Sequence, residues 1–334
     1  MKTSVIVPSF NHQDYVIKCL DSILHNYEPG MELLICDDCS SDTTPVQIDE
    51  WLKKEGTKFE RVVFIKHEKN QGITHSLNEL IAECRGELIS PLASDDFLLE
   101  GAIKARRKSL ESYPLWMGAF SDGLAIGLQN EIYSESILAS SGIDSESLQP
   151  FKIKKTILQN WVEPMNLQFW RRTAFKLHGG EFEFDGSVFC EDLNFALWAL
   201  AKNSFGYLDK KCVAYRCRTW PQVSSAKDPS ELRDKYKDMS ICYAASSAFY
   251  EEKYSRYMND KSLYFYYLSL NNKNKISDQY KKIAFGVVNT FFYYIYIFFW
   301  KISPYMTYRL CGDIVWWKKY LVKRHSNISY LNNY

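Results

Sequence analysis

Four consecutive strand–turn–helix patterns in the first 100 residues restrict the possible folds of this chain more than any other feature. Short apolar runs begin at Ser4, Glu32, Arg61 and Glu87, and each is followed by a polar turn and then by apolar residues at helical spacing. A strand that rejoins its sheet after a helix runs parallel to the strand before it. The repeats therefore predict an α/β fold with a parallel, doubly wound sheet and helices on both faces.

The charge and the cysteines exclude several classes of protein. Lys and Arg number 41 and Asp and Glu 40, so no overall field selects nucleic acid as a partner. Nine cysteines are scattered through the chain, and the C-x-x-C of Cys36 and Cys39 has no second pair that would complete a zinc-ribbon spacing. We expect reduced, mostly buried cysteines and a cytosolic environment. The N-terminal segment is too short and too soon polar for a signal peptide.

The turns after the predicted strands carry acidic pairs in place of glycine-rich phosphate loops. Neither GxGxxG nor a Walker A sequence occurs, which excludes an ordinary dinucleotide site and a P-loop. Asp95 and Asp96 end the apolar run that begins at Ile89. Two carboxylates at the carboxyl end of a strand lie where open α/β sheets bind ligands, and they can hold a cation. Alternatively, they cap a helix that begins near Leu99.

Four segments together resemble the family 2 glycosyltransferases, which have the GT-A fold. They are SVIVPSFN at 4–11, CDDCSSDTT at 36–44, NQG at 70–72 and ASDD at 93–96, in the family's order and spacing. The resemblance is to bacterial enzymes of polysaccharide, O-antigen or capsule synthesis. It implies a Rossmann-like, mostly parallel central sheet, a nucleotide-diphosphate sugar as donor and inversion at the anomeric carbon.

The resemblance also assigns donor-binding residues to the loops. The nucleotide would lie against Pro8, Phe10, Asn11, Asp38, Asn70 and Gly72. Asp38 would accept the imide N–H of uracil, while Asn70 and Gly72 would let the backbone approach the nucleotide. From the residues alone, 37–44 is also compatible with a hydrogen-bonded Asx/ST turn and 70–72 with an ordinary turn.

Asp95 and Asp96 correspond to the family's DXD element. That element holds a divalent cation, Mn²⁺ or Mg²⁺, which neutralises the leaving diphosphate. Ala93 stands where many members have the first Asp of the element. Asp95 is then the expected direct metal ligand, and Asp96 would contact the ribose, bind the metal or hold the loop.

Glu191 and Asp192 open a helical pattern in which Leu193, Leu197 and Leu200 share one face. The helix dipole favours carboxylates in a first turn, so capping alone is one explanation of the pair. The resemblance assigns the catalytic base to Asp192. Glu191 would orient Asp192 or contact the acceptor. This fifth match, with the residues that follow it, extends the resemblance to about residue 225.

Arg216 and Arg218 follow an apolar strand pattern at 212–215. Arg218 stands where the family often has a histidine. Arginine cannot ligate a metal, but it pairs well with phosphate oxygens. Either residue would therefore neutralise the diphosphate, and the alternative is a surface charge at the mouth of the site. Earlier in the chain, we expect a turn at Ser121–Gly123 and an exposed loop or insertion at Ser134–Gln149, near the acceptor.

Aromatic residues make up 16% of the chain, and much of the excess lies in its last third. Residues 283–300 contain no charge, but these 18 residues are at the short end for a bilayer span. A basic cluster at Lys318, Lys319, Lys323 and Arg324 suits anionic lipid headgroups. The alternatives are a helical hairpin in the membrane interface, a single span, or a soluble dimerisation or core helix.

We therefore expect a catalytic domain at 1–226, a helical extension at 227–282 and membrane-associating helices at 283–334, on the cytoplasmic face of the cell membrane. The predicted function is metal-assisted, inverting transfer of a sugar to a hydroxyl of a glycan or lipid-linked acceptor in cell-surface polysaccharide synthesis. The expected partners are the donor, the acceptor and the membrane surface, without nucleic acid. The alternatives are a non-catalytic nucleotide-sugar-binding or scaffold protein of the same fold and a nucleotidyltransferase, although Ser9–His12 offers no glycine-rich loop for the latter.

Overall fold

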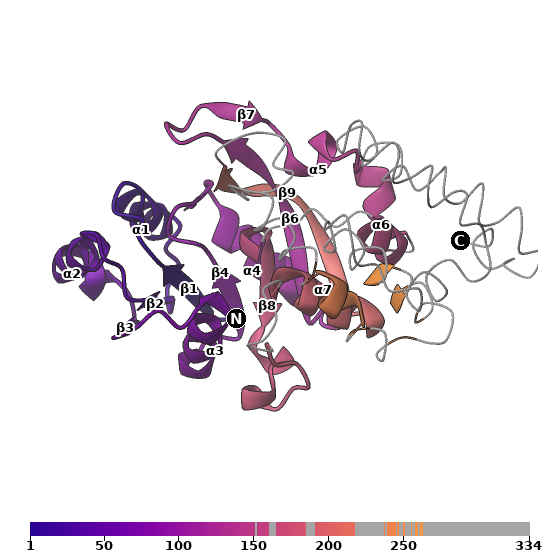
Figure 1. Cartoon of the computed structure of the whole chain (residues 1–334), viewed down its shortest axis with the longest axis horizontal. Helices are drawn as coiled ribbons and strands as arrows, with labels where there is room; N and C mark the ends of the chain where they lie inside the picture. Colours follow the sequence, from indigo (N-terminus) through magenta and orange to yellow (C-terminus); the bar gives the residue numbers. More distant parts are fainter. Residues whose placement is uncertain are drawn as a thin grey trace, which may run out of the picture.

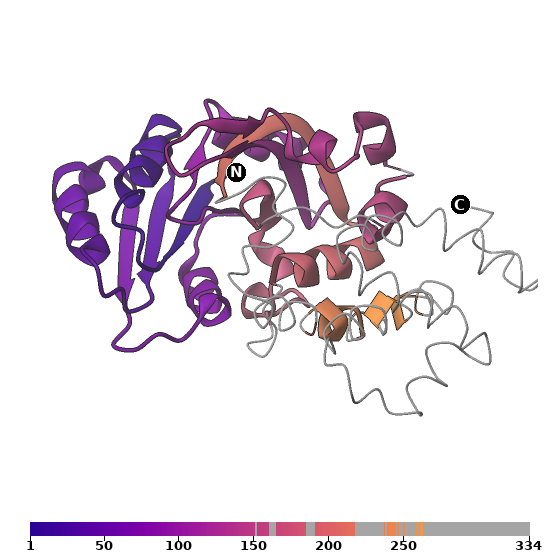
Figure 2. The same ribbon diagram turned by 45° about the horizontal axis from the view of Figure 1, so that its top comes forward.

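The computed structural model describes residues 1–150, 152–159, 165–184 and 191–217, with short helical pieces between 237 and 262. Within these residues, one nine-stranded sheet has the order β3-β2-β1-β4-β8-β6-β9-β5, and β7 pairs with β6 outside this path. Figures 1 and 2 show the elements of the first repeats at one end of the sheet and β6, β8 and β9 beside them.

The strands are β1 (Thr3–Ser9), β2 (Glu32–Asp37), β3 (Arg61–Lys66), β4 (Leu88–Pro91), β5 (Phe97–Leu98), β6 (Gly118–Ile126), β7 (Ile132–Ser134), β8 (Gln168–Arg171) and β9 (Phe205–Arg216). The α-helices are α1 (Val16–His25), α2 (Thr44–Glu55), α3 (Ile73–Glu83), α4 (Ala102–Ser112), α5 (Ile137–Ser140), α6 (Ile153–Gln159) and α7 (Glu191–Ala201).

The first half of the sheet is parallel, as the repeats predict. β3, β2, β1 and β4 are parallel neighbours in that order. Val5 and Val7 pack with α1 and α2 on one face, whereas Ile6 packs with α3 on the other. Since both faces are covered by helices, the strands are apolar at consecutive positions instead of alternating with polar residues.

The second half of the sheet is mixed. β8 runs antiparallel to β4 and β6, whereas β6 and β9 are parallel. The predicted turn at Ser121–Gly123 is wrong, because these residues lie inside β6, where the pairing with β9 shifts register. Asp122 Oδ1 accepts hydrogen bonds from the amides of Gly123 (2.8 Å) and Leu138 (3.2 Å). The polar residues therefore mark a bulge within the strand.

The serine-rich segment 134–149 is not the exposed loop that we predicted. Ile137 and Leu138 of α5 are buried in the core, and so are Ile143 and Leu148 farther along. Ser136 caps α5 by accepting a hydrogen bond from the Ala139 amide (2.9 Å). The serines thus satisfy the ends of short helical turns, while the few apolar residues between them anchor the segment.

The predicted C-terminal extensions lie largely outside the described residues: 283–334 entirely, and 227–282 except for the short helical pieces. In the part of the chain that is described, no helix combines the length and apolarity needed to cross a bilayer.

Glu32, the first residue of β2, connects several segments at the amino ends of the strands. Its Oε1 accepts hydrogen bonds from Ser4 Oγ (2.5 Å) and from the amides of Arg85 (2.6 Å) and Gly86 (3.0 Å). Its Oε2 pairs with the guanidinium of Arg61 (3.0 Å). Burial acts to raise the pKa of Glu32, but these donors outweigh burial and hold the pKa below its usual value.

Replacing Glu32→Gln should lower the free energy of unfolding by about 1–3 kcal/mol at pH 7, because buried donors lose a charged acceptor. Since the folded-state pKa is depressed, the carboxylate stabilises the fold above the unfolded pKa of about 4.3 and loses this contribution as the pH falls through its lower folded value. Denaturant unfolding from pH 7 to pH 3 should show the two proteins converging in stability. Glu50→Gln, on the exposed side of α2, is the control and should change little.

Candidate functional site

The loops that follow β1, β2, β3 and β4 meet at the carboxyl ends of these parallel strands. Asn11 follows β1, and its amide donates to Ser40 Oγ (2.8 Å) in the loop after β2. Asn11 Oδ1 accepts in return from the amide of Ser41 (2.8 Å). The backbone of Asn11 is in the left-handed region (φ 54°), and so is Gly72 before α3 (φ 87°). These tight loops form the edge at which open α/β sheets bind ligands.

Three more of the predicted nucleotide-binding residues lie on this edge. Pro8 belongs to β1, and its carbonyl accepts a hydrogen bond from the amide of Ser94 (3.3 Å). The side chain of Phe10 is 43% exposed just beyond the strand. Asn70 is exposed in the loop that precedes α3. Phe10 and Asn70 are therefore accessible at the edge where the sequence predicts nucleotide binding.

Asp38 is buried and held by three donors. Its Oδ1 accepts from the amide of Gln71 (2.7 Å) and pairs with His67 Nδ1 (2.7 Å), and its Oδ2 accepts from the amide of Gly72 (2.8 Å). Burial acts to raise the pKa of Asp38, but His67 and the two amides outweigh it and hold the pKa below its usual value. The loops after β2 and β3 are therefore joined through one ionised carboxylate.

Asp95 and Asp96 do not cap the following helix. The N-cap of α4 is Gly101, in a left-handed conformation, and the first amide of the helix, that of Ala102, donates to Asn26 Oδ1 (2.9 Å). The alternative of a capping pair is therefore wrong. The two carboxylates also differ in exposure, because the side chain of Asp95 is 29% exposed whereas Asp96 is 1% exposed.

Asp96 is held from two distant parts of the chain. Its Oδ1 accepts from the amide of Arg216 (2.6 Å), and its Oδ2 accepts from the side-chain amide of Asn166. Burial and the neighbouring charge of Asp95 raise the pKa of Asp96. Asp96 thus holds its loop, while the more exposed Asp95 is the one that a cation can reach.

Arg216, the last residue of β9, has its guanidinium engaged within the protein. Nε donates to the carbonyl of Asp95 (2.8 Å), and one terminal nitrogen donates to the carbonyls of Gly127 (2.7 Å) and Leu128 (3.1 Å). The other terminal nitrogen donates to Asn130 Oδ1 (2.8 Å). The guanidinium also lies over the ring of Tyr15, 4.2 Å from its centroid. These contacts place Arg216 beneath the Asp95–Asp96 turn. Arg218 lies outside the described residues.

His12 is a site residue that the sequence did not single out. Its Nε2 lies 3.7 Å from Asp95 Oδ2, and its Nδ1 is 2.8 Å from Ser94 Oγ. Ser94 Oγ is in turn bonded to Ser9 Oγ (2.9 Å). The sequence signal for His12 was its position directly after the PSFN segment, because the loop after the first strand faces the acidic pair.

Glu191 and Asp192 begin α7, as predicted, and Asp192 Oδ1 accepts from the amide of Leu193 (2.7 Å). The carbonyl of Asp192 accepts from Gln168 Nε2 (2.8 Å). Tyr215 links the acidic groups: burial raises the pKa of its phenol, and the charges of Asp96, Asp95 and Asp192 raise it further. The pair Asp95–Asp96 and Asp192, nearly a hundred residues apart in sequence, therefore both contribute to the electrostatic environment of Tyr215.

Asn166 and Gln168 were also missed by sequence reasoning. Asn166 binds Asp96 through its side-chain amide, and its Oδ1 accepts from the amide of Ala93 (2.7 Å). Gln168, two residues later, binds the carbonyl of Asp192. No local pattern identifies these amides, because their partners are distant in the sequence.

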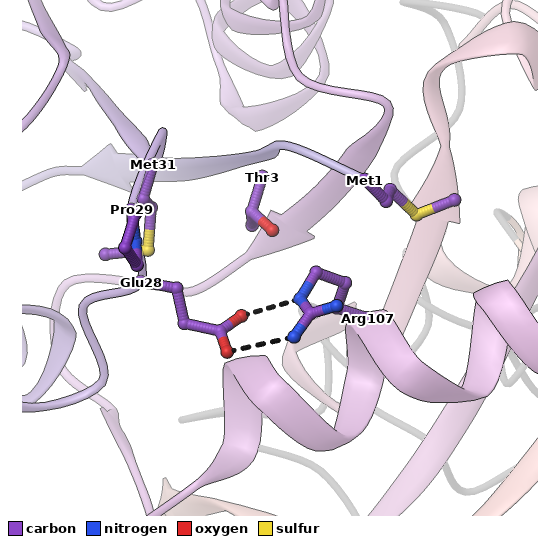
Figure 3. Close-up of a pocket in the computed structure, with 6 residues that line it drawn as sticks. All are labelled: Met1, Thr3, Glu28, Pro29, Met31 and Arg107. Atoms are coloured by element: carbon purple, nitrogen blue, oxygen red, sulfur yellow. Dashed lines mark hydrogen bonds and ion pairs between the residues drawn. The ribbon is translucent and has the colours of Figure 1, made fainter.

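A hollow lies elsewhere on the molecule. It encloses about 230 Å³ and is lined by Met1, Thr3, Glu28, Pro29, Met31 and Arg107 (Figure 3). Arg107 binds both carboxylate oxygens of Glu28 there (2.8 and 3.2 Å). Since Thr3 is the first residue of β1, this hollow is at the amino ends of the strands, away from the loops described above.

Comparison with known sequences matches the first third of the chain to a family model. Residues 4–120 match the model described as Glycosyl transferase family 2. Chondroitin synthase from Escherichia coli is 37% identical over 101 residues, 30% of this chain and 14% of that protein. GalNAc(5)-diNAcBac-PP-undecaprenol beta-1,3-glucosyltransferase from Campylobacter jejuni is 33% identical over 113 residues, 34% of this chain and 36% of that protein. The chain thus spans well under two thirds of either relative.

Two solved structures share the fold. Staphylococcus aureus TarS (residues 1–349), in complex with UDP-GlcNAc, has a TM-score of 0.60 and 21% identity, covering 86% of this chain and 80% of that one. The mannosyltransferase PcManGT from Pyrobaculum calidifontis, in complex with GDP-Man and Mn²⁺, has a TM-score of 0.57 and 13% identity, covering 93% of this chain and 82% of that one. Residues 4–120 therefore match glycosyltransferase family 2, and the chain has the GT-A fold expected from its sequence.

Proposed function

We propose that this chain is an inverting glycosyltransferase that moves a sugar from a nucleotide-diphosphate sugar to a hydroxyl of a glycan or lipid-linked acceptor in cell-surface polysaccharide synthesis. The family match at residues 4–120 supports the reaction class. TarS and PcManGT, which share the fold, are described with bound nucleotide sugars. The name of the Campylobacter relative specifies a lipid-linked oligosaccharide, which supports the acceptor class.

One observation carries the proposal: a single short segment holds both acidic clusters. Asn166 binds the carboxylate of Asp96, and Gln168 binds the carbonyl of Asp192. Asn166 lies in a 3-10 turn (Met165–Leu167) and Gln168 is the first residue of β8, so the two residues are at most about 7 Å apart. A donor held near Asp95 and an acceptor near Asp192 would therefore be close enough to react.

Asp192 is the proposed general base. Its carboxylate is at the N-terminus of α7, where Oδ1 accepts a hydrogen bond from the amide of Leu193. It would take the proton of the acceptor hydroxyl as that oxygen attacks the anomeric carbon from the face opposite the leaving group. Glu191, at the first position of the helix, would orient Asp192 or contact the acceptor.

The residues present fit a divalent cation at Asp95. This carboxylate is partly exposed, while the oxygens of Asp96 already accept from Arg216 and Asn166. We therefore assign the direct ligand to Asp95, with His12 beside it, and a loop-holding role to Asp96. A bound Mn²⁺ or Mg²⁺ would offset the charge of the diphosphate. Arg216 would act by positioning the Asp95–Asp96 turn.

Asp38 has one lone-pair position that could accept a hydrogen bond from a nucleobase. A carboxylate has about four lone-pair positions. Three are used by Gln71, His67 and Gly72, two of them on Oδ1 and one on Oδ2. The remaining position on Oδ2 would accept the imide N–H of uracil. Pro8, Phe10, Asn11 and Asn70 would surround the rest of the nucleoside, and Arg218 would pair with the phosphates.

We also propose that the enzyme binds the cytoplasmic surface of the cell membrane through its C-terminal segment.

Replacing Asp192→Asn should lower the transfer rate by about 10²–10⁴-fold while leaving donor affinity within a factor of about two, because only the proton acceptor is removed. Asp95→Asn should instead weaken metal-dependent donor binding at least about tenfold. Binding and transfer are measured with UDP-, GDP- and dTDP-sugars in Mn²⁺ or Mg²⁺. Asp209→Asn, exposed on β9, is the matched control. Donor binding without transfer of any sugar would favour the scaffold alternative, and unchanged transfer by Asp192→Asn would remove that residue from its role.

Replacing Asn166→Ala should cost about 1–3 kcal/mol of stability, because the Ala93 amide and the Asp96 carboxylate each lose a buried partner. It should also weaken donor binding, since the Asp95–Asp96 turn loses a support. Asn78→Ala is the matched control, because Asn78 makes its own tertiary hydrogen bond to the carbonyl of Phe184 (2.9 Å) away from the acidic clusters. Calorimetry of donor binding separates the two variants. Equal donor affinity in both would show that Asn166 supports only the fold.

A further inference from the structure

A second cluster of metal-binding side chains lies beside the first two loops, apart from the acidic pair at Asp95. Cys36 is in β2, His67 directly follows β3, and Glu79 is in α3. Their ligand atoms all lie within 4.8 Å of one another. His67 Nε2 is at the centre, 3.4 Å from Cys36 Sγ and 2.6 Å from Glu79 Oε2. One sulfur, one nitrogen and one oxygen atom thus converge from three elements.

Hydrogen bonds on the side away from Cys36 and Glu79 fix the orientation of His67. Its side chain is 4% exposed, and its Nδ1 is bonded to Asp38 Oδ1 (2.7 Å). Its backbone amide donates to the carbonyl of Asp37 (2.9 Å). A carboxylate on the far nitrogen of a histidine is the usual support of a metal-bound imidazole, because it fixes the tautomer and leaves Nε2 for the metal.

The open side of the cluster faces α3. His75 precedes Glu79 by one helical turn, and its Nδ1 is 3.9 Å from Glu79 Oε2. The rings of His67 and His75 meet edge to face, with centroids 5.4 Å apart. His75 is about half exposed, so solvent reaches this side of the cluster and a water molecule has access. A fourth ligand is therefore available on this side.

We propose that Cys36, His67 and Glu79 form a site for a transition-metal ion of the zinc class, with its fourth position beside His75. Thiolate and imidazole select Zn²⁺ and its relatives, whereas Mg²⁺ and Ca²⁺ take oxygen ligands. In a tetrahedral zinc site, sulfur and nitrogen ligands are about 3.6 Å apart, and nitrogen and oxygen ligands about 3.4 Å. The Cys36–His67 distance of 3.4 Å is close to this value.

Binding requires a small, balanced change. Glu79, which is 44% exposed, must move back by about 0.8 Å from its hydrogen bond with His67. The proton of the Cys36 thiol and any proton on His67 Nε2 are released to solvent, and no oxidation or reduction occurs. The bound ion would join the ends of β2 and β3 to α3, and it would stabilise the folded chain because the unfolded chain lacks the assembled site.

The test uses Co²⁺ and Zn²⁺ with the full chain, purified without a polyhistidine tag and stripped with a chelator. Co²⁺ should give a thiolate-to-metal charge-transfer band in the near ultraviolet, and Zn²⁺ should displace it at about one equivalent per chain. Zn²⁺ should also raise the melting temperature. A wild-type chain without the cobalt–thiolate band would overturn the proposal and leave the cluster as a hydrogen-bonded network.

Variants assign the ligands. Cys36→Ser should abolish the band, while Cys84→Ser, which alters a second buried cysteine outside the cluster, should retain it. Glu79→Gln changes a half-exposed side chain and should fold normally, with zinc affinity lowered at least about tenfold. Asp95→Asn should leave the band unchanged, which separates this site from the proposed donor metal. Persistence of the band in Cys36→Ser would overturn the assignment, whatever the outcome for sugar transfer.

Discussion

The arrangement of the site depends on the buried carboxylate of Asp96. A carboxyl group this far from water is tolerated only if its oxygens are hydrogen-bonded. The two donors come from β9 and from the segment before β8, far away in the sequence. Satisfying one side chain therefore fixes the β4 loop against the second half of the sheet. Asp95, the preceding residue, is thereby presented at the surface of the edge where the first four loops meet.

The fold was largely predictable from the sequence because its signals are local. Apolar runs such as 32–36 and 61–65 end within a residue of the observed strands, since a strand buried on both faces must be apolar throughout. The bulge at Asp122 and the buried apolar residues of 134–149 were not predictable in the same way. Short polar residues signal turns in sequence, but here Asp122 accepts from the amide of Leu138, 16 residues away, and Ser136 caps a short buried helix.

The sequence singled out the acidic residues of the proposed site. It did not single out the groups that hold them. Asp38, Asp95 and Asp192 stand in motifs whose order along the chain is informative. Asn166, Gln168 and His12 act through partners that only the folded chain brings near, and an isolated amide or histidine carries no pattern. Arg216 illustrates the limit in the other direction: its position in a motif suggested phosphate, whereas in the fold its donors bind carbonyls of the chain itself.

The guanidinium of Arg216 makes one side of the candidate site rigid. It fastens the loop at 127–130, the turn at Asp95 and the ring of Tyr15 into one unit. The loop, the turn and the ring are already ordered in the folded protein. A molecule that binds here therefore does not lose affinity to the conformational entropy of ordering them. If the proposed donor binds here, this rigid side of the site would select it by shape. Any adjustment to sugars of different size would then have to occur on the other side of the site.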